Sequence, residues 1–123
     1  MGKKNQLRIL KVEPGKAPEE KQISNNLDSL QAEVGGGCIE CIDLENDTVL
    51  VCNDEGKLNG MEMNRRLGDD IICGPFFLVG ESGEDFASLT DEQLAEQQVR
   101  FAQPEQFADF EPDAQPRMTF FGF

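Results

Sequence analysis

The stretch CIECIDLENDTVLVCN, residues 38–53, decides the fold class. Its two halves, CIECIDL and TVLVCN, are rich in residues that favour strands, and the polar residues Glu45, Asn46 and Asp47 separate them. Two such runs joined by a short polar loop are typical of an antiparallel hairpin. We therefore expect a sheet that is built outward from this hairpin.

Two further strands are expected, one before the hairpin in the sequence and one after it. The segment of residues 3–13, which contains the run LRILKVE, predicts a first strand that ends at Pro14 and Gly15, and residues 16–22 form a polar connection. IICGPFFLVG is the most apolar stretch and predicts a strand over residues 76–79. Because Gly74 and Pro75 do not fit an uninterrupted central strand, we expect a bulge or a sheet edge at that point.

A first helix is predicted within ISNNLDSLQAEVGGG, residues 23–37. Leu27, Leu30 and Val34 recur at spacings of three and four, as on one face of a helix. The preceding SNN supplies N-cap residues. The GGG that follows ends the helix, because glycine adopts the left-handed conformation of a helix C-terminus without strain.

A second helix carries the strongest local signature, SLTDEQLAEQQVRFAQP, residues 88–104. Thr90 and Gln93 form a capping box, and Leu89 and Leu94 occupy the positions of a hydrophobic staple. The helix must end before Pro104. Its predicted buried stripe consists of Leu94, Ala95, Val99, Phe101 and Ala102.

The order of elements predicts an α+β fold. The loop of residues 54–60 leads to a short predicted helix over residues 61–67, after which Gly68, Asp69 and Asp70 turn the chain. We expect one domain, over residues 1–103, with an about four-stranded, mostly antiparallel sheet, two main helices and one short helix. Residues 104–123 are expected to form an extended C-terminal tail rich in Phe and Pro.

The tail holds three of the six prolines and five of the nine phenylalanines. Apolar side chains are unfavourable in water, so these rings are expected to pack on the domain, on a neighbouring copy or on a partner protein. The tail residues that could bind a partner are Phe107, Phe110, Phe120, Phe121 and Phe123.

Charge is the feature of the composition that departs furthest from average. The chain has 24 acidic and 11 basic residues, no histidine and a formal net charge of −13. Such a charge disfavours direct binding to nucleic acid or to anionic membranes and favours a basic protein partner. The plainer interpretation is that acidity keeps the protein soluble. No stretch has the length of a membrane span or the pattern of a secretion signal, so we expect a cytoplasmic protein.

The sequence gives little support to catalysis. Without histidine, a nucleophile activated by imidazole is excluded, and no glycine-rich phosphate-binding motif is present. Paired carboxylates are too abundant to single out one pair. We therefore lean towards a protein that is not an enzyme and needs no cofactor.

The four cysteines suggest a metal site only superficially. Cys38 and Cys41 have CxxC spacing, and Cys52 and Cys73 complete a set of four thiols. However, residues three apart in a strand point to opposite faces, and the second pair lacks the spacing. We expect no metal site and interpret the cysteines as thiols in the core.

The loop that follows the hairpin holds the candidate ligand-binding or partner-binding residues. VCNDEGKLNGMEMNRRL, residues 51–67, contains the only Arg-Arg pair of the chain. A local positive spot could hold one anionic group. Alternatively, the two arginines pair with nearby carboxylates on a solvated rim, or the asparagines satisfy loop backbone groups. The candidates are Asn53, Glu55, Lys57, Asn64, Arg65 and Arg66.

Four segments of the chain resemble a family of small proteins from bacteria, phages and plasmids, catalogued as domain of unknown function 3846. They are LKVEPGKAPEEKQISNNLDSLQAEVGG, VLVCNDEGKLNGMEMNRRL, IICGPFFLVG and FASLTDEQL, and the resemblance covers residues 7–98. The positions that match the family pattern are Asn53, Glu55, Gly56, Lys57, Asn64, Arg65, Gly74, Phe76 and Gly80. The family pattern favours a small residue or valine at Cys38 and Cys41, which further weakens a metal role.

The resemblance implies a mobile-element setting, in which accessory and anti-defence genes are common, and no known enzyme activity. Our first hypothesis is a non-catalytic accessory protein of a phage or mobile element that binds a host or phage protein through an acidic surface. A second hypothesis is a small anionic-ligand binder or enzyme that uses the loop of residues 53–66. A third is a homo-oligomeric structural or replication-associated component.

Overall fold

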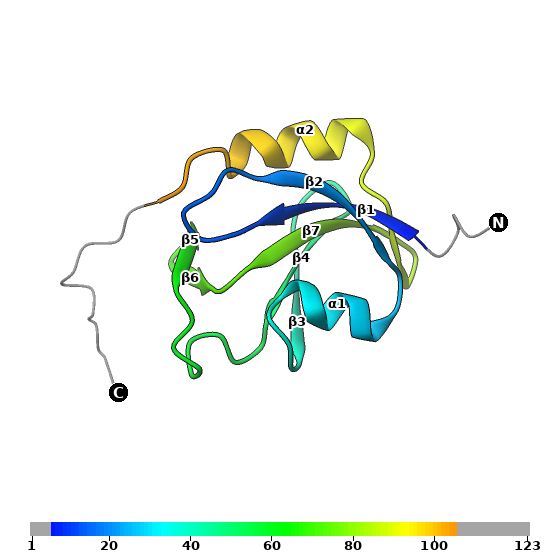
Figure 1. Cartoon of the computed structure of the whole chain (residues 1–123). Helices are drawn as coiled ribbons and strands as arrows, with labels where there is room; N and C mark the ends of the chain where they lie inside the picture. Colours follow the sequence, from blue (N-terminus) through cyan, green and yellow to red (C-terminus); the bar gives the residue numbers. More distant parts are fainter. Residues whose placement is uncertain (1–5, 106–123) are drawn as a thin grey trace.

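The computed structural model of the protein describes residues 6–105, and a mostly antiparallel sheet lies at its centre (Figure 1). The strands of this sheet follow one another in the order β2 (Glu19–Ser24), β1 (Gln6–Val12), β7 (Phe76–Ser82), β4 (Thr48–Asn53) and β3 (Ile39–Asp43). The short strand β8 (Asp85–Ala87) pairs with β7. A separate two-stranded sheet consists of β5 (Met63–Leu67) and β6 (Asp70–Cys73).

The main sheet therefore has six strands in place of the expected four. β2 lies in a segment that the sequence assigned in large part to a polar connection. Only Ile23 of β2 is buried, and the other residues of the strand are exposed at the edge of the sheet. An edge strand of this kind shows no apolar alternation, so the prediction missed it.

The predicted hairpin is confirmed as β3 and β4. Ile42 lies opposite Leu50, and the Leu44 N–H donates to the carbonyl of Thr48 at 2.8 Å. Asn46 and Asp47 form the tip with positive φ angles of 62° and 53°. Asparagine and aspartate tolerate this left-handed conformation better than other residues with a Cβ, which explains their place in the turn.

β7 contains the predicted strand of residues 76–79 and lies in the middle of the sheet, between β1 and β4. The prediction of a bulge or a sheet edge at Gly74 and Pro75 is wrong. Both residues precede β7 and separate it from β6, and Gly74 has a φ of +86°. Proline therefore lies outside the ladder, and the strand that follows it runs uninterrupted through the core.

Both main helices are confirmed with their caps. α1 (Leu27–Glu33) has Asn26 as its N-cap, whose side chain accepts a hydrogen bond from the Ser29 N–H at 2.8 Å. The three glycines that follow α1 all have positive φ, as expected at a helix C-terminus. α2 (Asp91–Arg100) begins with the predicted capping box, in which the side chains of Thr90 and Gln93 each accept from the other's backbone N–H.

The buried stripe of α2 differs from the prediction. Leu94 and Phe101 are buried and Ala102 is half-buried, but Ala95 is exposed and Val99 is 80% exposed. Gln93 and Gln97 occupy buried positions in its place. The Gln93 side chain donates to the carbonyls of the hairpin tip, at 2.7 and 3.0 Å, and so holds the start of α2 against the β3–β4 turn.

The predicted short helix over residues 61–67 is wrong, because this segment contains β5. β5 pairs with β6, with Arg66 opposite Ile71, and Gly68 turns the chain with a φ of +61°. The apolar residues of MEMNRRL fit the spacing of a helix as well as that of a strand. The buried side chains of Asn64 and Arg65 contact each other and backbone carbonyls of distant segments, and a local pattern alone does not reveal those distant contacts.

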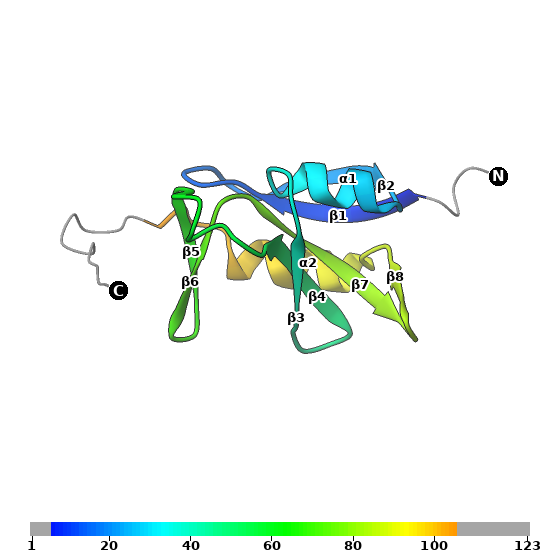
Figure 2. The same cartoon turned by 90° about the horizontal axis from the view of Figure 1, so that it is seen from below.

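The sheet divides the core into two layers, and the two helices lie on opposite faces of it (Figures 1 and 2). Leu30 and Val34 of α1 pack with Val49, Phe77 and other residues of one face. The other face is covered by α2 and by the β5–β6 hairpin. Its core cluster is Leu10, Val12, Leu50, Cys52, Ile72, Phe76, Leu78, Leu89, Leu94 and Phe101.

Neither helix within residues 6–105 has the length and apolar character needed to cross a bilayer. The predicted extended tail lies outside the described residues apart from its first two positions. All five of its candidate phenylalanines, residues 107–123, fall in this undescribed part.

Candidate functional site

Asn53 joins the end of α1 to the loop that follows β4. Its side-chain amide donates to the carbonyls of Val34 and Gly36 at 3.0 and 2.6 Å. Its side-chain oxygen accepts from the Glu55 N–H at 2.8 Å. These contacts satisfy backbone groups at a helix end and at the start of the loop, so Asn53 has a structural role.

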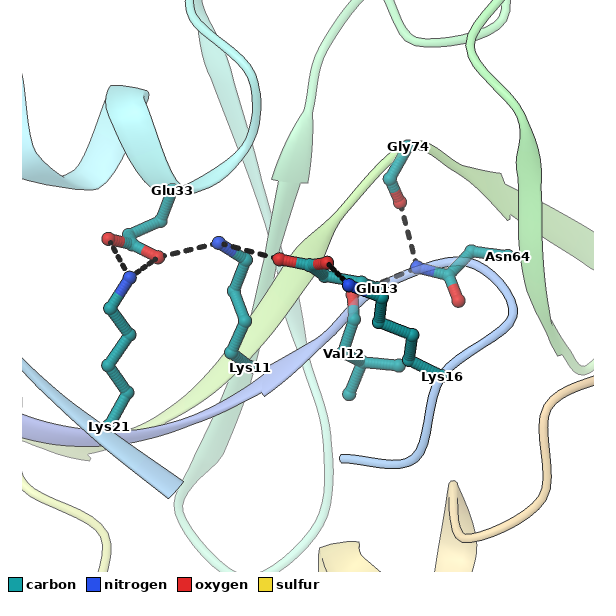
Figure 3. A network of polar contacts seen from close by, with 8 residues as sticks. All are labelled: Lys11, Val12, Glu13, Lys16, Lys21, Glu33, Asn64 and Gly74. Atoms are coloured by element: carbon teal, nitrogen blue, oxygen red, sulfur yellow. Dashed lines mark hydrogen bonds and ion pairs between the residues drawn. The ribbon is translucent and has the colours of Figure 1, made fainter. Parts of the chain in front are cut away.

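Asn64 has a comparable role on β5. Its side chain is buried, and its amide nitrogen donates to the carbonyls of Val12 and Gly74, both at 2.9 Å (Figure 3). The contact with Val12 attaches the β5–β6 hairpin to the end of β1, and the contact with Gly74 closes the connection to β7. A side chain without two amide donors at this position would leave two carbonyls unpaired.

Arg65 is only 1% exposed, which excludes the predicted solvated rim for this residue. Its guanidinium donates to the carbonyl of Phe101 at 3.3 and 3.1 Å, to the carbonyl of Lys16 at 2.6 Å and to the Asn64 side-chain oxygen at 2.8 Å. Burial lowers the pKa of Arg65, and the charge of Glu105 acts in the opposite direction. Arginine remains protonated in such sites, so it serves as a fixed set of donors that joins three segments.

The remaining candidates of the loop lie at the surface. Lys57 forms an ion pair with Asp70, and Arg66 forms one with Glu105 at 3.5 Å. Glu55 is exposed. Lys57 and Arg66 thus each face a carboxylate, whereas the buried Arg65 donates to backbone carbonyls. The residues of the expected positive spot do not converge on one site.

A hollow lies on the α2 face of the sheet, between the β3–β4 hairpin and the β5–β6 hairpin. We call it the β3 hollow, and its volume is about 360 Å³. Its apolar lining includes Ile42, Cys52 and Ile72. Charged side chains also line it, and three of the four are acidic: Glu40, Asp54, Asp70 and Lys57.

A second hollow, which we call the α2 hollow, begins where the β3 hollow ends along β3. It has a volume of about 670 Å³ and lies between the end of β3 and the last turns of α2. Exposed Val99 contributes apolar surface, Asp43, Glu45 and Glu96 contribute carboxylates, and Arg100 contributes one cation. Together the two hollows follow β3 along its length, since Glu40 and Ile42 line the first and Asp43 lines the second.

The thiols at the β3 hollow are poor nucleophiles. Burial, followed by the charge of Glu40, raises the pKa of Cys52 to about 12. Burial also raises the pKa of Cys73. Since the thiolate is the reactive form, neither cysteine is activated at neutral pH.

The interpretation of all four cysteines as core thiols holds only in part. Cys52 is buried and Cys73 is half-buried, whereas Cys38 and Cys41 are exposed. Residues 6–105 contain no group of three or more Cys, Asp or Glu side chains placed to hold a metal ion.

Charge is distributed unevenly over the molecule. Arg8, Lys11 and Lys21 lie on β1 and β2, where each forms ion pairs with carboxylates. Figure 3 shows those of Lys11 and Lys21. No lysine or arginine occurs between Lys21 and Lys57 or within residues 67–99. These cation-free segments supply β3, β4, β7, β8 and nearly all of α2. The β3 side of the molecule is therefore predominantly acidic, with Lys57 and Arg100 as cations beside the hollows, and the β2 side carries more balanced charge.

Sequence reasoning missed the residues along β3 as site candidates. Glu40, Ile42 and Asp43 were assigned only to a hairpin strand, and Glu96 only to a helix. The long interval without lysine or arginine, residues 22–56, was a signal visible in the sequence. It acquires meaning only when the fold shows that β3 lies at an edge beside α2.

The fold defined by these observations is an α+β arrangement with one helix on each face of a mostly antiparallel sheet. The chain belongs to the family described as Domain of unknown function (DUF3846), whose model matches residues 7–102. This match confirms the resemblance seen in the sequence. Searches of curated proteins and of solved structures return no match to this chain.

Proposed function

We propose that this protein is a non-catalytic binding module that attaches to a cationic surface of a host or phage protein in the cytoplasm. On this proposal it serves as an accessory protein of a phage or mobile element, with an anti-defence or regulatory role. The observation that carries the proposal is the separation of charge between the β3 side and the β2 side of the molecule.

The carboxylates around the two hollows support this function. We call them the acidic rim: Glu40, Asp43, Glu45, Asp54, Asp70 and Glu96. Like charges that are gathered in one region repel one another and generate a field that attracts a cationic partner and raises its association rate. The same field repels the phosphates of nucleic acid, so a protein partner is favoured over DNA or RNA.

The contacts of the loop argue against the anionic-ligand alternative. Lys57 faces Asp70, and Arg65 is buried among carbonyl groups. An anion would have to displace these contacts and approach a surface of the same sign. The thiols at the β3 hollow also lack the low pKa that a nucleophilic enzyme would need.

A capture experiment with matched variants tests the proposal. The immobilised chain is incubated with lysate of a bacterial host at about 0.1 M salt and washed at about 1 M, where the Debye length falls from about 10 to about 3 Å. We expect basic proteins to bind and then to be released. The double variant Asp43→Asn, Glu96→Gln should lose them, because it removes two charges of the acidic rim.

The matched control is the double variant Glu19→Gln, Asp28→Asn. It changes the net charge by the same amount on β2 and at the start of α1, and it should retain the captured proteins. Equal loss in both double variants would show that net charge alone matters. Equal retention in both, or saturable binding of the purified chain to bare oligonucleotides, would overturn the proposal.

A further inference from the structure

β3 presents an open edge of the main sheet. It is the last strand of the path, next to β4. The Leu44 N–H donates to Thr48 at 2.8 Å, and the Asp54 N–H donates to Cys38 at 2.9 Å. Because hydrogen-bonded pairs alternate along an antiparallel ladder, the even-numbered residues of β3 face β4.

The odd-numbered residues of β3 therefore direct their backbone N–H and C=O groups away from the sheet. They are Ile39, Cys41 and Asp43, and within residues 6–105 no other strand pairs with them. Cys41 and Asp43 are exposed. Proteins commonly protect such an edge with lysine, proline or a bulge, and β3 contains no lysine and no proline.

We infer that the outer edge of β3 accepts an extended, cationic segment of the partner protein as an added antiparallel strand. This inference rests on the proposed function and specifies how the partner binds. Main-chain hydrogen bonds to Ile39, Cys41 and Asp43 would hold the segment, as in other cases of strand addition. The carboxylates of the acidic rim would select cationic side chains.

The two faces of β3 determine which side chains the segment should carry. Glu40 and Ile42 share the face of Cys52 and Leu50, which is the face of the β3 hollow. Residues of the added strand opposite Ile42 would thus place apolar side chains beside the hollow. Residues opposite Cys41 and Asp43 would lie on the other face, where the Asp43 carboxylate suits lysine or arginine.

Two other segments could in principle pair with this edge: β3 of a second copy and the chain's own C-terminal residues. Charge disfavours both. Pairing of β3 with β3 of a second copy would bring the Glu40 and Asp43 carboxylates of both chains together. The chain's own residues 106–123 carry Asp109, Glu111 and Asp113 against Arg117 alone, so they share the sign of the acidic rim. A cationic segment has the opposite sign and no such repulsion.

The β2 edge is a weaker site for strand addition. Its Lys21 is paired with Glu33, and the nearby hollow is lined by Gln6, Arg8, Gln22 and Ser88, which are all polar. An added strand would find no apolar surface there. The β3 edge combines open backbone groups, a partly apolar hollow and a surface on which carboxylates outnumber the cations Lys57 and Arg100.

A set of three synthetic peptides tests the inference with the full chain. The parent peptide alternates lysine and valine over nine residues, one isomer carries backbone N-methyl groups on its lysines, and the other carries them on its valines. All three have the same charge. In an added antiparallel strand, the lysines opposite Cys41 and Asp43 direct their N–H groups at β3, and the valines direct theirs away.

Titration calorimetry should show that the lysine-methylated isomer binds at least about tenfold more weakly than the parent, while the valine-methylated isomer binds within about threefold of it. The variant Cys41→Pro should lose the parent peptide, because it removes an outward N–H. The variant Cys41→Ser should retain it. The N-methyl comparison uses the unmodified chain, so it does not depend on whether Cys41→Pro folds.

Several outcomes would overturn the inference. If all three peptides bind alike, the acidic surface binds cations but not by strand addition, and the proposed function survives. If none binds, the β3 edge is not a site, and the lysate capture decides the proposed function separately. Displacement of the parent by a peptide of residues 106–123, or a dimer in light scattering that Cys41→Pro dissociates, would assign the edge to the chain itself.

Discussion

The Arg65 guanidinium donates two hydrogen bonds to the carbonyl oxygen of Phe101, at 3.3 and 3.1 Å. Phe101 is the C-cap of α2, so its carbonyl lies at a helix end that needs donors. The first arginine of the only Arg-Arg pair therefore fastens the β5–β6 hairpin to the end of α2. It does so from the interior, at the place where the sequence suggested a ligand rim.

Replacing this arginine should destabilise the fold strongly. Arg65→Met keeps most of the side-chain length but leaves the carbonyls of Lys16 and Phe101 without their donors. We expect a loss of about 3 kcal/mol in the free energy of unfolding, since each buried unpaired group costs about 1–3 kcal/mol. Urea denaturation followed by circular dichroism measures it.

The neighbouring substitution Arg66→Met is the matched control. The Arg66 side chain is half exposed and its ion pair with Glu105 is at the surface, so its loss should change the unfolding free energy by less than about 1 kcal/mol. Equal effects of the two substitutions would contradict the structural role assigned to Arg65.

Gly56 is required by a close approach of the loop of residues 54–60 to the end of β6. A Cβ at this position would lie 2.5 Å from the carbonyl oxygen of Cys73, which is backbone and cannot move aside easily. Gly56→Ala should therefore destabilise the protein by about 1–3 kcal/mol. Gly60→Ala provides the comparison, because Gly60 has a φ of +72° but open space around it, and should cost only about 1 kcal/mol. Melting curves in which Gly60→Ala is the more damaging change would refute this packing argument.

Glu33 should make stability depend on pH. Burial alone would raise the pKa of Glu33, but hydrogen bonds from Lys11 at 2.7 Å and Lys21 at 3.0 Å outweigh it, so the pKa is lowered (Figure 3). A carboxyl group whose pKa is lower in the folded state stabilises the protein above its unfolded pKa, about 4.3 for glutamate. This contribution disappears as the pH falls through the lower, folded-state pKa.

The substitution Glu33→Gln isolates this effect. At pH 7 the variant should be less stable than the parent by about 1–2 kcal/mol, because two lysines lose a charged partner. Near about pH 3 the two proteins should approach equal stability. Glu19→Gln on exposed β2 is the matched control for the loss of one carboxylate at pH 7. If the difference in unfolding free energy between the parent and Glu33→Gln stays constant from pH 7 to pH 3, the ion pairs contribute nothing.

The cysteines should react with iodoacetamide in an order set by exposure and pKa. Cys38 and Cys41 are exposed, and burial followed by the charge of Asp43 raises the pKa of Cys41. Cys52 is buried and its pKa is raised to about 12. At pH 8 we expect Cys38 to be alkylated before Cys41, and Cys52 last. Peptide mass spectrometry over time gives the order, and early labelling of Cys52 would mean that the β3 hollow opens.

The sequence predicted the elements whose signals are local. The Thr90–Gln93 capping box, the Asn26 cap and the β3–β4 hairpin each depend on residues within a few positions of one another. β5 was mistaken for a helix because the burial of Asn64 and Arg65 depends on partners that are distant in sequence, such as the carbonyls of Val12 and Phe101.

The candidate site was predicted less well for the same reason. The loop of residues 53–66 attracted attention because it holds rare cations in an acidic chain, yet its buried members satisfy backbone groups. The β3 edge was not predicted as a site, because Glu40 and Asp43 are ordinary residues of a hairpin. Their importance depends on strand order and on the position of α2, which no local pattern specifies.

Amide hydrogen exchange of the chain with and without its captured basic partner tests the central claim most directly. The outward N–H groups of Ile39, Cys41 and Asp43 should exchange rapidly in the isolated protein and become protected in the complex, and the amides of the β2 edge should remain unchanged. Protection that appears at β2 or elsewhere, with β3 still exchanging rapidly, would contradict binding along the β3 edge.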